Sequence, residues 1–326
     1  PIDLNGFFQN WIEEAGFAHF DIIWTLKQNG RYKVHIKQTP RFNETNYRGT
    51  VATLTAFGAN FERFDSQILI FNREQTFDVN CPFEPVYWAF DFDDRISDAV
   101  TTDWAVFQPG EHSLDMPQGM LSDITIANNS ADSMLLRVEH HWAPVDGTYG
   151  APEGVVLSRQ RYWNVDGIWG GEVSMSAELT YSGLRSNSLR FGYLDDELIR
   201  ITEDSLVLLY RPNAASAWEL ATDYTKNMGS LFDKRGTIEI NNLKKGQYSL
   251  AMYDANLANI ETIDDPAYRF QLYPNPAKDV LNVEFTKEHS CCTLEITNLQ
   301  GQVVYSEYMS KRTKKKVIDI SQLVPG

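Results

Sequence analysis

Histidine is the residue type through which this chain could most readily bind a metal or transfer protons. The six histidines are His19, His35, His112, His140, His141 and His289. A zinc-peptidase helix carries two histidines four residues apart with a glutamate between them, and no two of these histidines have that spacing. We therefore predict that this chain contributes no catalytic, cofactor-binding or metal-binding residues.

The densest group of titratable residues is Glu139-His140-His141-Trp142. On a strand, Glu139 and His141 would share one face and His140 would lie on the other. A zinc ion there would need further ligands from other segments. We therefore interpret the group as a structural part of a β-sandwich.

A second group is acidic and comprises Asp91, Asp93, Asp94, Asp98 and Asp103. Calcium requires closely spaced oxygen ligands, but the central glycine and closing glutamate of an EF-hand are missing. A solvated acidic loop is the favoured interpretation, and a bound cation is the alternative.

Two further groups could have a chemical role. Tyr162, Trp163 and Trp169 flank Asp166-Gly167 and would suit sugar stacking if exposed, although aromatic residues of a sandwich usually belong to its core. The three cysteines are too few for a disulfide framework and lack metal-ligand spacing, so we expect buried free thiols at Cys81, Cys291 and Cys292. No serine or cysteine has a recognisable partner arrangement for nucleophilic catalysis.

Composition and charge exclude some classes of function. The net charge of −15 argues against nucleic-acid binding, which depends on a basic surface. No apolar run is long enough for a transmembrane segment. The opening PIDLNGFFQN does not resemble a signal peptide, so we expect the chain to be the C-terminal part of a longer precursor.

Alternating apolar residues and regularly spaced turns predict a mostly β fold with a short N-terminal helix. We expect tandem β-sandwich domains of immunoglobulin or fibronectin type. The expected division is a helix remnant at 1–19, a first sandwich at 20–115, a second sandwich at 116–265 and a C-terminal module at 266–326. The expected strands are 20–26, 32–36, 50–57, 67–72, 75–79, 86–90, 123–127, 134–141, 173–181, 198–201, 206–210, 237–240 and 247–253, with turn-rich segments at 143–154 and 164–171.

Residues 3–15 have the pattern of one amphipathic helix. Its apolar stripe comprises Leu4, Phe7, Phe8, Trp11 and Ile12. Five large apolar side chains on a short helix need a partner surface. We interpret the helix as the last piece of a preceding helical domain.

The segment from Tyr268 to Gly326 contains YPNPAKD, then an apolar strand, then NLQGQVV and IDISQLVPG. Together these motifs resemble the C-terminal sorting domain of type IX secretion substrates of Bacteroidetes. The resemblance implies the type IX machinery as a partner and a secreted or cell-surface location, reached through the periplasm and the outer membrane. Family members usually continue past the PG with another strand, so we expect the module to be truncated at Gly326.

The stretches DLNGFFQNWIEEAGFAHFDIIW and YKVHIKQTP resemble the join between the catalytic domain and the next sandwich in aminopeptidase-N-like zinc metallopeptidases. Phe8-Gln9-Asn10-Trp11 and Gly16 match that pattern, whereas Ala18 stands where proline is commonest. The stretches RVEHHWAPVDG, SRQRYWNVDG and LVLLYRPN are similar to the downstream region of secreted members.

This second resemblance implies that the chain is the non-catalytic C-terminal region of a secreted aminopeptidase. The preceding catalytic domain would be its partner and would hold the zinc, since none of the zinc machinery lies in this chain. The alternative is an adhesive or carbohydrate-binding accessory region of another secreted protein.

Overall fold

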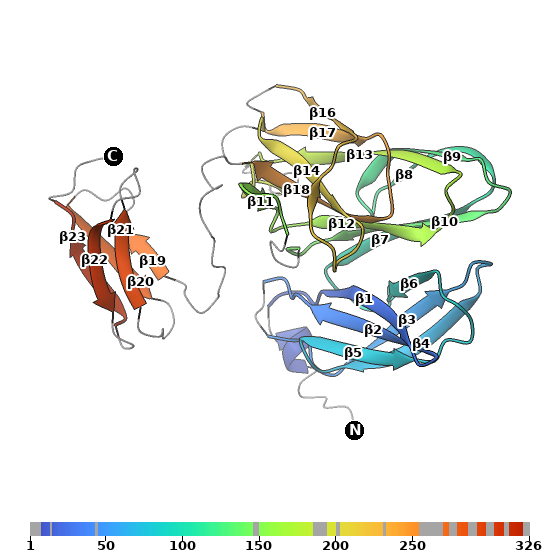
Figure 1. The fold of residues 1–326 in the computed structure, drawn as a ribbon, viewed down its shortest axis with the longest axis horizontal. Coiled ribbons are helices and arrows are strands. Elements are labelled where there is room, and N and C mark those ends of the chain that lie inside the picture. Colours follow the sequence, from blue (N-terminus) through green and yellow to red (C-terminus); the bar gives the residue numbers. More distant parts are fainter. Residues whose placement is uncertain are drawn as a thin grey trace. The chain divides into compact units, whose positions relative to one another are not determined.

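The computed structural model describes residues 8–13, 15–42, 45–145, 150–184, 194–199, 203–230, 233–253, 270–273, 279–285, 292–297, 303–309 and 313–321. The chain divides into two compact units, Pro1–Asn259 and Ile260–Gly326. Nearly all regular structure in both units is antiparallel β-strand (Figure 1), which confirms the predicted mostly β fold.

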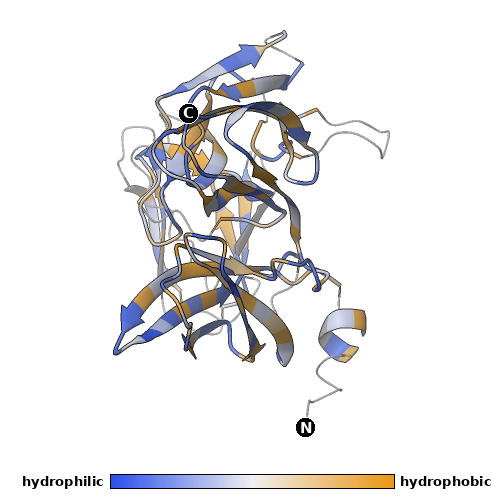
Figure 2. Ribbon diagram, turned by 90° about the vertical axis from the view of Figure 1, so that its right-hand side faces the viewer, coloured by the Kyte–Doolittle hydropathy of each residue, from blue (hydrophilic) through white to orange (hydrophobic). Residues whose placement is uncertain are grey.

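The first sandwich packs two three-stranded sheets, β1-β2-β5 and β4-β3-β6, against each other. Its strands are β1 (Phe20–Gln28), β2 (Arg31–Gln38), β3 (Thr50–Phe57), β4 (Arg63–Ile70), β5 (Glu74–Val79) and β6 (Tyr87–Phe90). Apolar and polar residues alternate along these strands (Figure 2), and the inward set includes Val34, Ile36 and Leu54. The turn between β1 and β2 at Asn29-Gly30 has positive φ at both residues, as a two-residue hairpin turn requires.

The N-terminal helical turn, η1 (Gln9–Glu13), is shorter than predicted, although Leu4, Phe7 and the rest of 1–7 lie outside the described residues. Trp11 packs on the core of the first sandwich, with its ring 4.9 Å from that of Tyr47. Phe8 and Ile12 are 50% and 65% exposed. The expected apolar stripe is therefore divided between one side chain that anchors the turn and two that remain on the surface.

The second sandwich packs a seven-stranded sheet on a five-stranded one. The strands of the larger sheet are β7 (Val100–Phe107), β10 (Met134–His141), β11 (Val155–Leu157), β12 (Tyr162–Ile168), β14 (Leu206–Arg211), β15 (Glu219–Leu220) and β18 (Gly246–Tyr253). Those of the smaller sheet are β8 (Gly110–Met116), β9 (Leu121–Asn128), β13 (Val173–Ser182), β16 (Tyr224–Met228) and β17 (Arg235–Ile240). The core between them includes Leu136, Val138, Val165, Leu208 and Leu250, all almost fully buried.

Three sequence-based expectations need correction. β7 and β8 pair with β10 and β9, so both belong to the second sandwich, and the expected boundary at 115 falls inside β8. The segment 164–171, expected to be turn-rich, contributes most of the central strand β12. Among residues 198–201, Leu198 lies in a turn, and 200–201 lie outside the described residues.

The C-terminal unit contains a three-stranded sheet, β19-β20-β23, and a two-stranded sheet, β21-β22. The strands are β19 (Phe270–Tyr273), β20 (Val280–Phe285), β21 (Cys292–Thr297), β22 (Val303–Met309) and β23 (Lys315–Asp319). Val283, Met309 and Ile318 are buried at its centre. The sequence indicates a turn at Asn298-Leu299-Gln300-Gly301 and a linker at Asp264-Asp265-Pro266, and both segments lie outside the described residues.

Candidate functional site

The candidate site in the first unit lies on the outer face of the larger sheet of the second sandwich, where the first sandwich covers it. Residues of β10 alternate between the two faces of this sheet, so Leu136 and Val138 enter the apolar core. Arg137, Glu139 and His141 point the other way, yet each is at least 90% buried. A polar face that is shielded from water in this way needs partners for its charges.

Strand register places one polar residue from each of five neighbouring strands in a single row across this face. Asn164 lies opposite both Glu139 and Gln247, while Glu139 also lies opposite Thr102. Gln247 in turn lies opposite Arg211. The row therefore runs through β14, β18, β12, β10 and β7, and we call it the polar row.

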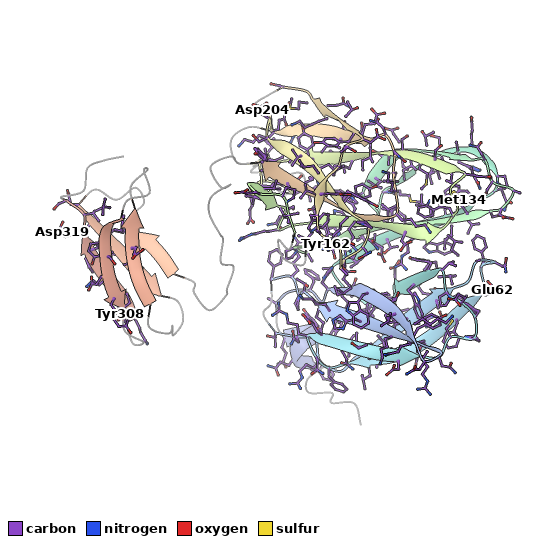
Figure 3. All side chains as sticks on the ribbon, in the orientation of Figure 1. Glu62, Met134, Tyr162, Asp204, Tyr308 and Asp319 are labelled. Atoms are coloured by element: carbon purple, nitrogen blue, oxygen red, sulfur yellow. The ribbon has the colours of Figure 1, made fainter. Side chains whose placement is uncertain are left out.

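Hydrogen bonds link the second sandwich to Asp21 of β1 and to His19, which lies just before β1. They involve Gln247 of the polar row and its neighbours Tyr162 and His141, and together these residues form a polar network. Asp21 Oδ2 accepts hydrogen bonds from Gln247 Nε2 and from the Tyr162 hydroxyl, both at 3.0 Å. The Tyr162 hydroxyl also lies 3.2 Å from His19 Nε2, which lies 2.9 Å from His141 Nδ1. Tyr162 lies where the two sandwiches meet (Figure 3), so this network joins them directly.

The two histidine rings connect the Tyr162 hydroxyl to Glu139. His19 Nε2 is within hydrogen-bonding distance of both the Tyr162 hydroxyl and His141 Nδ1. His141 Nε2 faces Glu139 Oε2 at 3.6 Å. The polar contacts therefore run without a break from Asp21 to the Glu139 carboxylate.

The Glu139 carboxylate is the negative centre of the network. Arg137 Nη2 lies 3.0 Å from Glu139 Oε1, and Asn164 Nδ2 donates to Oε2 over 2.6 Å. Burial opposes the ionisation of Glu139, but Arg137, His141 and Asn164 outweigh it and hold its pKa at about 2. The pair is therefore charged at neutral pH.

Other groups at the junction are shifted toward their neutral forms. Burial raises the pKa of Asp98 to about 7 and that of Asp166 to about 6. Burial also raises the pKa of Asp21, and burial together with His141 lowers the pKa of His19 well below its usual range. The junction thus combines one stable ion pair with several carboxyl groups that resist ionisation.

A cavity of about 550 Å³ opens beside this network, between β1 and β6 of the first sandwich and the polar face of the second. Its wall includes Asp21, Arg137, Glu139, Asn164 and Gln247. This volume lies in the usual range for ligand sites, about 300–1,000 Å³. The arrangement can hold a polar ligand, but the network itself contains no serine or cysteine that could act as a nucleophile.

The structure places Glu139, His140 and His141 on the predicted strand, with the predicted alternation of faces. His140 is fully buried on the opposite face, where its ring lies 5.2 Å from that of Trp163. Tyr162 and Trp163 are buried in the strand itself, so they offer no sugar-stacking platform. Cys81 is a buried free thiol as expected, whereas Cys291 and the side chain of Cys292 lie outside the description.

The acidic segment does not converge on a cation position. Asp93 accepts from Arg63 and Arg95, at 2.8 and 2.9 Å. Asp91 accepts a hydrogen bond from the backbone N–H of Ile96, and Asp98 accepts one from that of Val100. Asp103 accepts hydrogen bonds from the backbone N–H groups of Gln118 and Gly119. Among the described residues, no group of three or more histidine, cysteine or acidic side chains could hold a metal ion.

Sequence reasoning missed most of the residues that form the junction. His19, Asp21, Arg137, Tyr162, Asn164, Arg211 and Gln247 were not selected as candidates for it. The sequence signal that could have indicated them is the stretch MLLRVEHH, in which polar residues alternate with apolar ones along one strand. That pattern usually indicates a solvent-facing side, and nothing local in the sequence shows that a second domain covers it.

Comparison with known proteins identifies the C-terminal unit. Residues 271–326 match the family described as the secretion system C-terminal sorting domain. This module is a type IX sorting domain, and it indicates a secreted or cell-surface protein that engages the type IX machinery. No curated protein and no solved structure matches the chain. Within the described ranges, no helix has the length and hydropathy to cross a membrane.

Proposed function

We propose that the first unit is the non-catalytic β-sandwich region of a secreted aminopeptidase-N-like zinc metallopeptidase, and that the sorting domain directs its export. The observation that carries this proposal is the exposed apolar surface around the N-terminal helical turn. The resemblance of residues 3–24 and 32–40 to the join after such a catalytic domain supports the same assignment.

The apolar surface combines the helical turn with the start of the first sandwich. Phe8, Ile12, Phe17 and Phe42 are 50%, 65%, 52% and 73% exposed. Phe17 and Arg41 exchange two backbone hydrogen bonds of 2.9 Å, which brings Phe17 close to Phe42. Large exposed apolar groups of this kind mark contact surfaces, and a preceding catalytic domain is the proposed occupant.

Trp11 supports this assignment, because it fixes the helical turn to the sandwich and so presents Phe8 and Ile12 in a defined place. The zinc of the proposed peptidase would be held by the preceding domain. The described residues of this chain do not fit a zinc site, since they include no suitable ligand group.

The proposal is tested on protein isolated from the producing bacterium. An antibody raised against this chain should capture a polypeptide with a mass above the 37.3 kDa of this chain from the medium or the cell surface. That material should hydrolyse an aminoacyl-aminocoumarin substrate, lose activity with a chelator and regain it with Zn²⁺. A captured protein with no such activity, or with activity that the chelator leaves intact, would refute the peptidase assignment.

A further inference from the structure

The cavity between the two sandwiches has a wall formed by the edges of two sheets. β1 pairs only with β2, and β6 pairs only with β3, among the sheets that the structure describes. Consecutive residues line the cavity in both places, 22–25 of β1 and 85–90, which comprise β6 and the two residues before it. A run of consecutive residues on a cavity wall indicates that backbone as well as side chains faces the space.

The hairpin turn determines which backbone groups of β1 are open. The two-residue turn makes Gln28 and Arg31 a hydrogen-bonded pair. Alternation along the strand then directs the N–H and C=O groups of Thr25 and Lys27 away from β2. No further backbone hydrogen bond is made by residues 22–28 within the described ranges. An open edge of this type can accept an extended peptide as an additional strand.

Arg137 supplies a second sign of a carbonyl-bearing ligand. It is 2% exposed and lines the cavity. Its guanidinium contacts Glu139, the carbonyl of Phe90, the Tyr87 hydroxyl and the Phe92 ring. Its Nε and Nη1 atoms have no well-aligned acceptor among the described residues. Buried donors normally have acceptors, and peptide carbonyl groups would provide them.

The negative charge of the cavity lining indicates that the ligand carries basic side chains. Five lining aspartates have no ion-pair partner within 4.0 Å among the described residues, whereas Lys27 and Arg137 already face Glu84 and Glu139. These aspartates are Asp21, Asp91, Asp94, Asp98 and Asp166. Burial raises the pKa of four of them, Asp21, Asp94, Asp98 and Asp166, so a nearby cation would stabilise their ionised forms.

We propose that this cavity binds an extended peptide segment with lysine or arginine side chains, which adds as a strand to the edge of β1. Backbone groups of the peptide pair with the open groups of Thr25 and Lys27. Its basic side chains face the five aspartates that lack an ion-pair partner, and one of its carbonyl oxygens accepts a hydrogen bond from Arg137. The proposal stands on the first unit alone and does not depend on a peptidase parent.

The test measures fluorescence anisotropy of labelled five-residue peptides with the full chain. The basic peptide is Val-Lys-Val-Arg-Val, and its matched controls carry glutamate in place of both cations or N-methyl groups on alternate backbone nitrogens. We expect both controls to bind at least tenfold more weakly than the basic peptide. The N-methylated control needs no change in the protein, so it tests strand addition even where a variant fails to fold.

Two protein variants locate the site. Asp94→Asn keeps the side-chain shape, suits the positive φ of 50° at this position and removes a lining charge. Thr25→Pro removes an outward N–H from an edge strand, where proline is tolerated. We expect Asp94→Asn to weaken binding of the basic peptide threefold to tenfold and Thr25→Pro to weaken it at least tenfold. Asp78→Asn on β5, outside the cavity, should leave the affinity unchanged.

Several results would overturn the proposal. They are the absence of binding by the basic peptide, equal binding of the glutamate or N-methylated peptide, and equal weakening by Asp78→Asn and Asp94→Asn. The last result would mean general attraction to an acidic protein. Displacement of the basic peptide by maltotriose would assign the cavity to carbohydrate instead.

Discussion

The two faces of the larger sheet in the second sandwich are built on opposite principles, although both are buried. One face carries Leu136, Val138 and Val165 into an apolar core. The other carries Arg137, Glu139 and Asn164 against the first sandwich. Apolar burial stabilises in proportion to area and has little directionality, whereas a buried ion pair is stable only with correctly placed partners.

The two faces contribute differently to the first unit: one to its stability and the other to the arrangement of its two sandwiches. The apolar face supplies most of the stability of the second sandwich, since burial of each large side chain contributes roughly 1.5–3 kcal/mol. The polar face fixes how the two sandwiches meet, because its hydrogen bonds from Gln247 and Tyr162 to Asp21 are satisfied in one arrangement. Substitutions on the two faces should therefore differ in how much they lower the free energy of unfolding. They should also differ in whether a second substitution can restore the loss.

The largest effect is expected on the polar face. Arg137→Met removes the cation beside Glu139 and leaves a buried charge without its main partner. We expect a loss of about 3–5 kcal/mol in the free energy of unfolding, measured with urea. The double variant Arg137→Met/Glu139→Leu should recover most of that loss, and a double variant as unstable as the single one would contradict this interpretation.

A somewhat smaller effect is expected on the apolar face. Leu136→Ala leaves a cavity in the core, and we expect a loss of about 2–4 kcal/mol. Replacing a polar residue on the other face with an apolar one should not restore the stability lost in Leu136→Ala. The same urea experiment measures this variant, and its loss should be equal at pH 6 and pH 8 because no titrating group is removed.

A change of opposite sign is expected at Asp98. The raised pKa, about 7, means that the folded state binds a proton more tightly than the unfolded state, whose value is near 3.8. Stability from this group therefore falls as pH rises from about 4 to 7. Because the side chain is partly exposed, we expect Asp98→Asn to stabilise the chain by only about 1–2 kcal/mol at pH 8.

The pH dependence checks the cause of that gain. The difference between Asp98→Asn and the parent chain should shrink toward zero as pH approaches 4. Thermal melting at pH 4.5, 6 and 8 measures the trend. A stabilisation that is the same at all three values would show that burial of the charge is not responsible.

The smallest effect is expected at an exposed ion pair, which serves as the reference for the buried one. Lys33 Nζ lies 3.0 Å from Asp78 Oδ1 on the first sandwich, and the two side chains are 32% and 53% exposed. Lys33→Gln should cost less than about 1 kcal/mol, because water and salt screen such pairs. A loss as large as that of Arg137→Met would remove the distinction between exposed and buried pairs.

The predictable parts of the fold are those that depend on local patterns. The Asn29-Gly30 pair is a local sequence signal for a two-residue hairpin and forms one, and the apolar alternation predicted β3, β10, β14 and β18 with nearly correct bounds. The motifs from YPNPAKD to IDISQLVPG identified the sorting domain. These features are written in short stretches of sequence, so no knowledge of distant contacts was needed.

The junction was not predictable for the same reason. Asn164, Asp166 and Gly167 have the composition of a turn, but they lie in β12 because their polar face is covered by another domain. β7 and β8 were missed because their polar residues obscured the strand pattern, and their pairing with β10 and β9 joins segments that local patterns cannot connect. Long-range burial of polar residues leaves no local periodicity of its own.

The central claim is that the polar network holds the two sandwiches as one unit, and a double-mutant cycle across the contact tests it most directly. Asp21→Asn changes the first sandwich, and Tyr162→Phe removes only the hydroxyl that donates to it from the second. Urea unfolding of both single variants, the double variant and the parent gives their coupling energy. The account predicts about 1–2 kcal/mol of coupling, and additive losses with no coupling would contradict it.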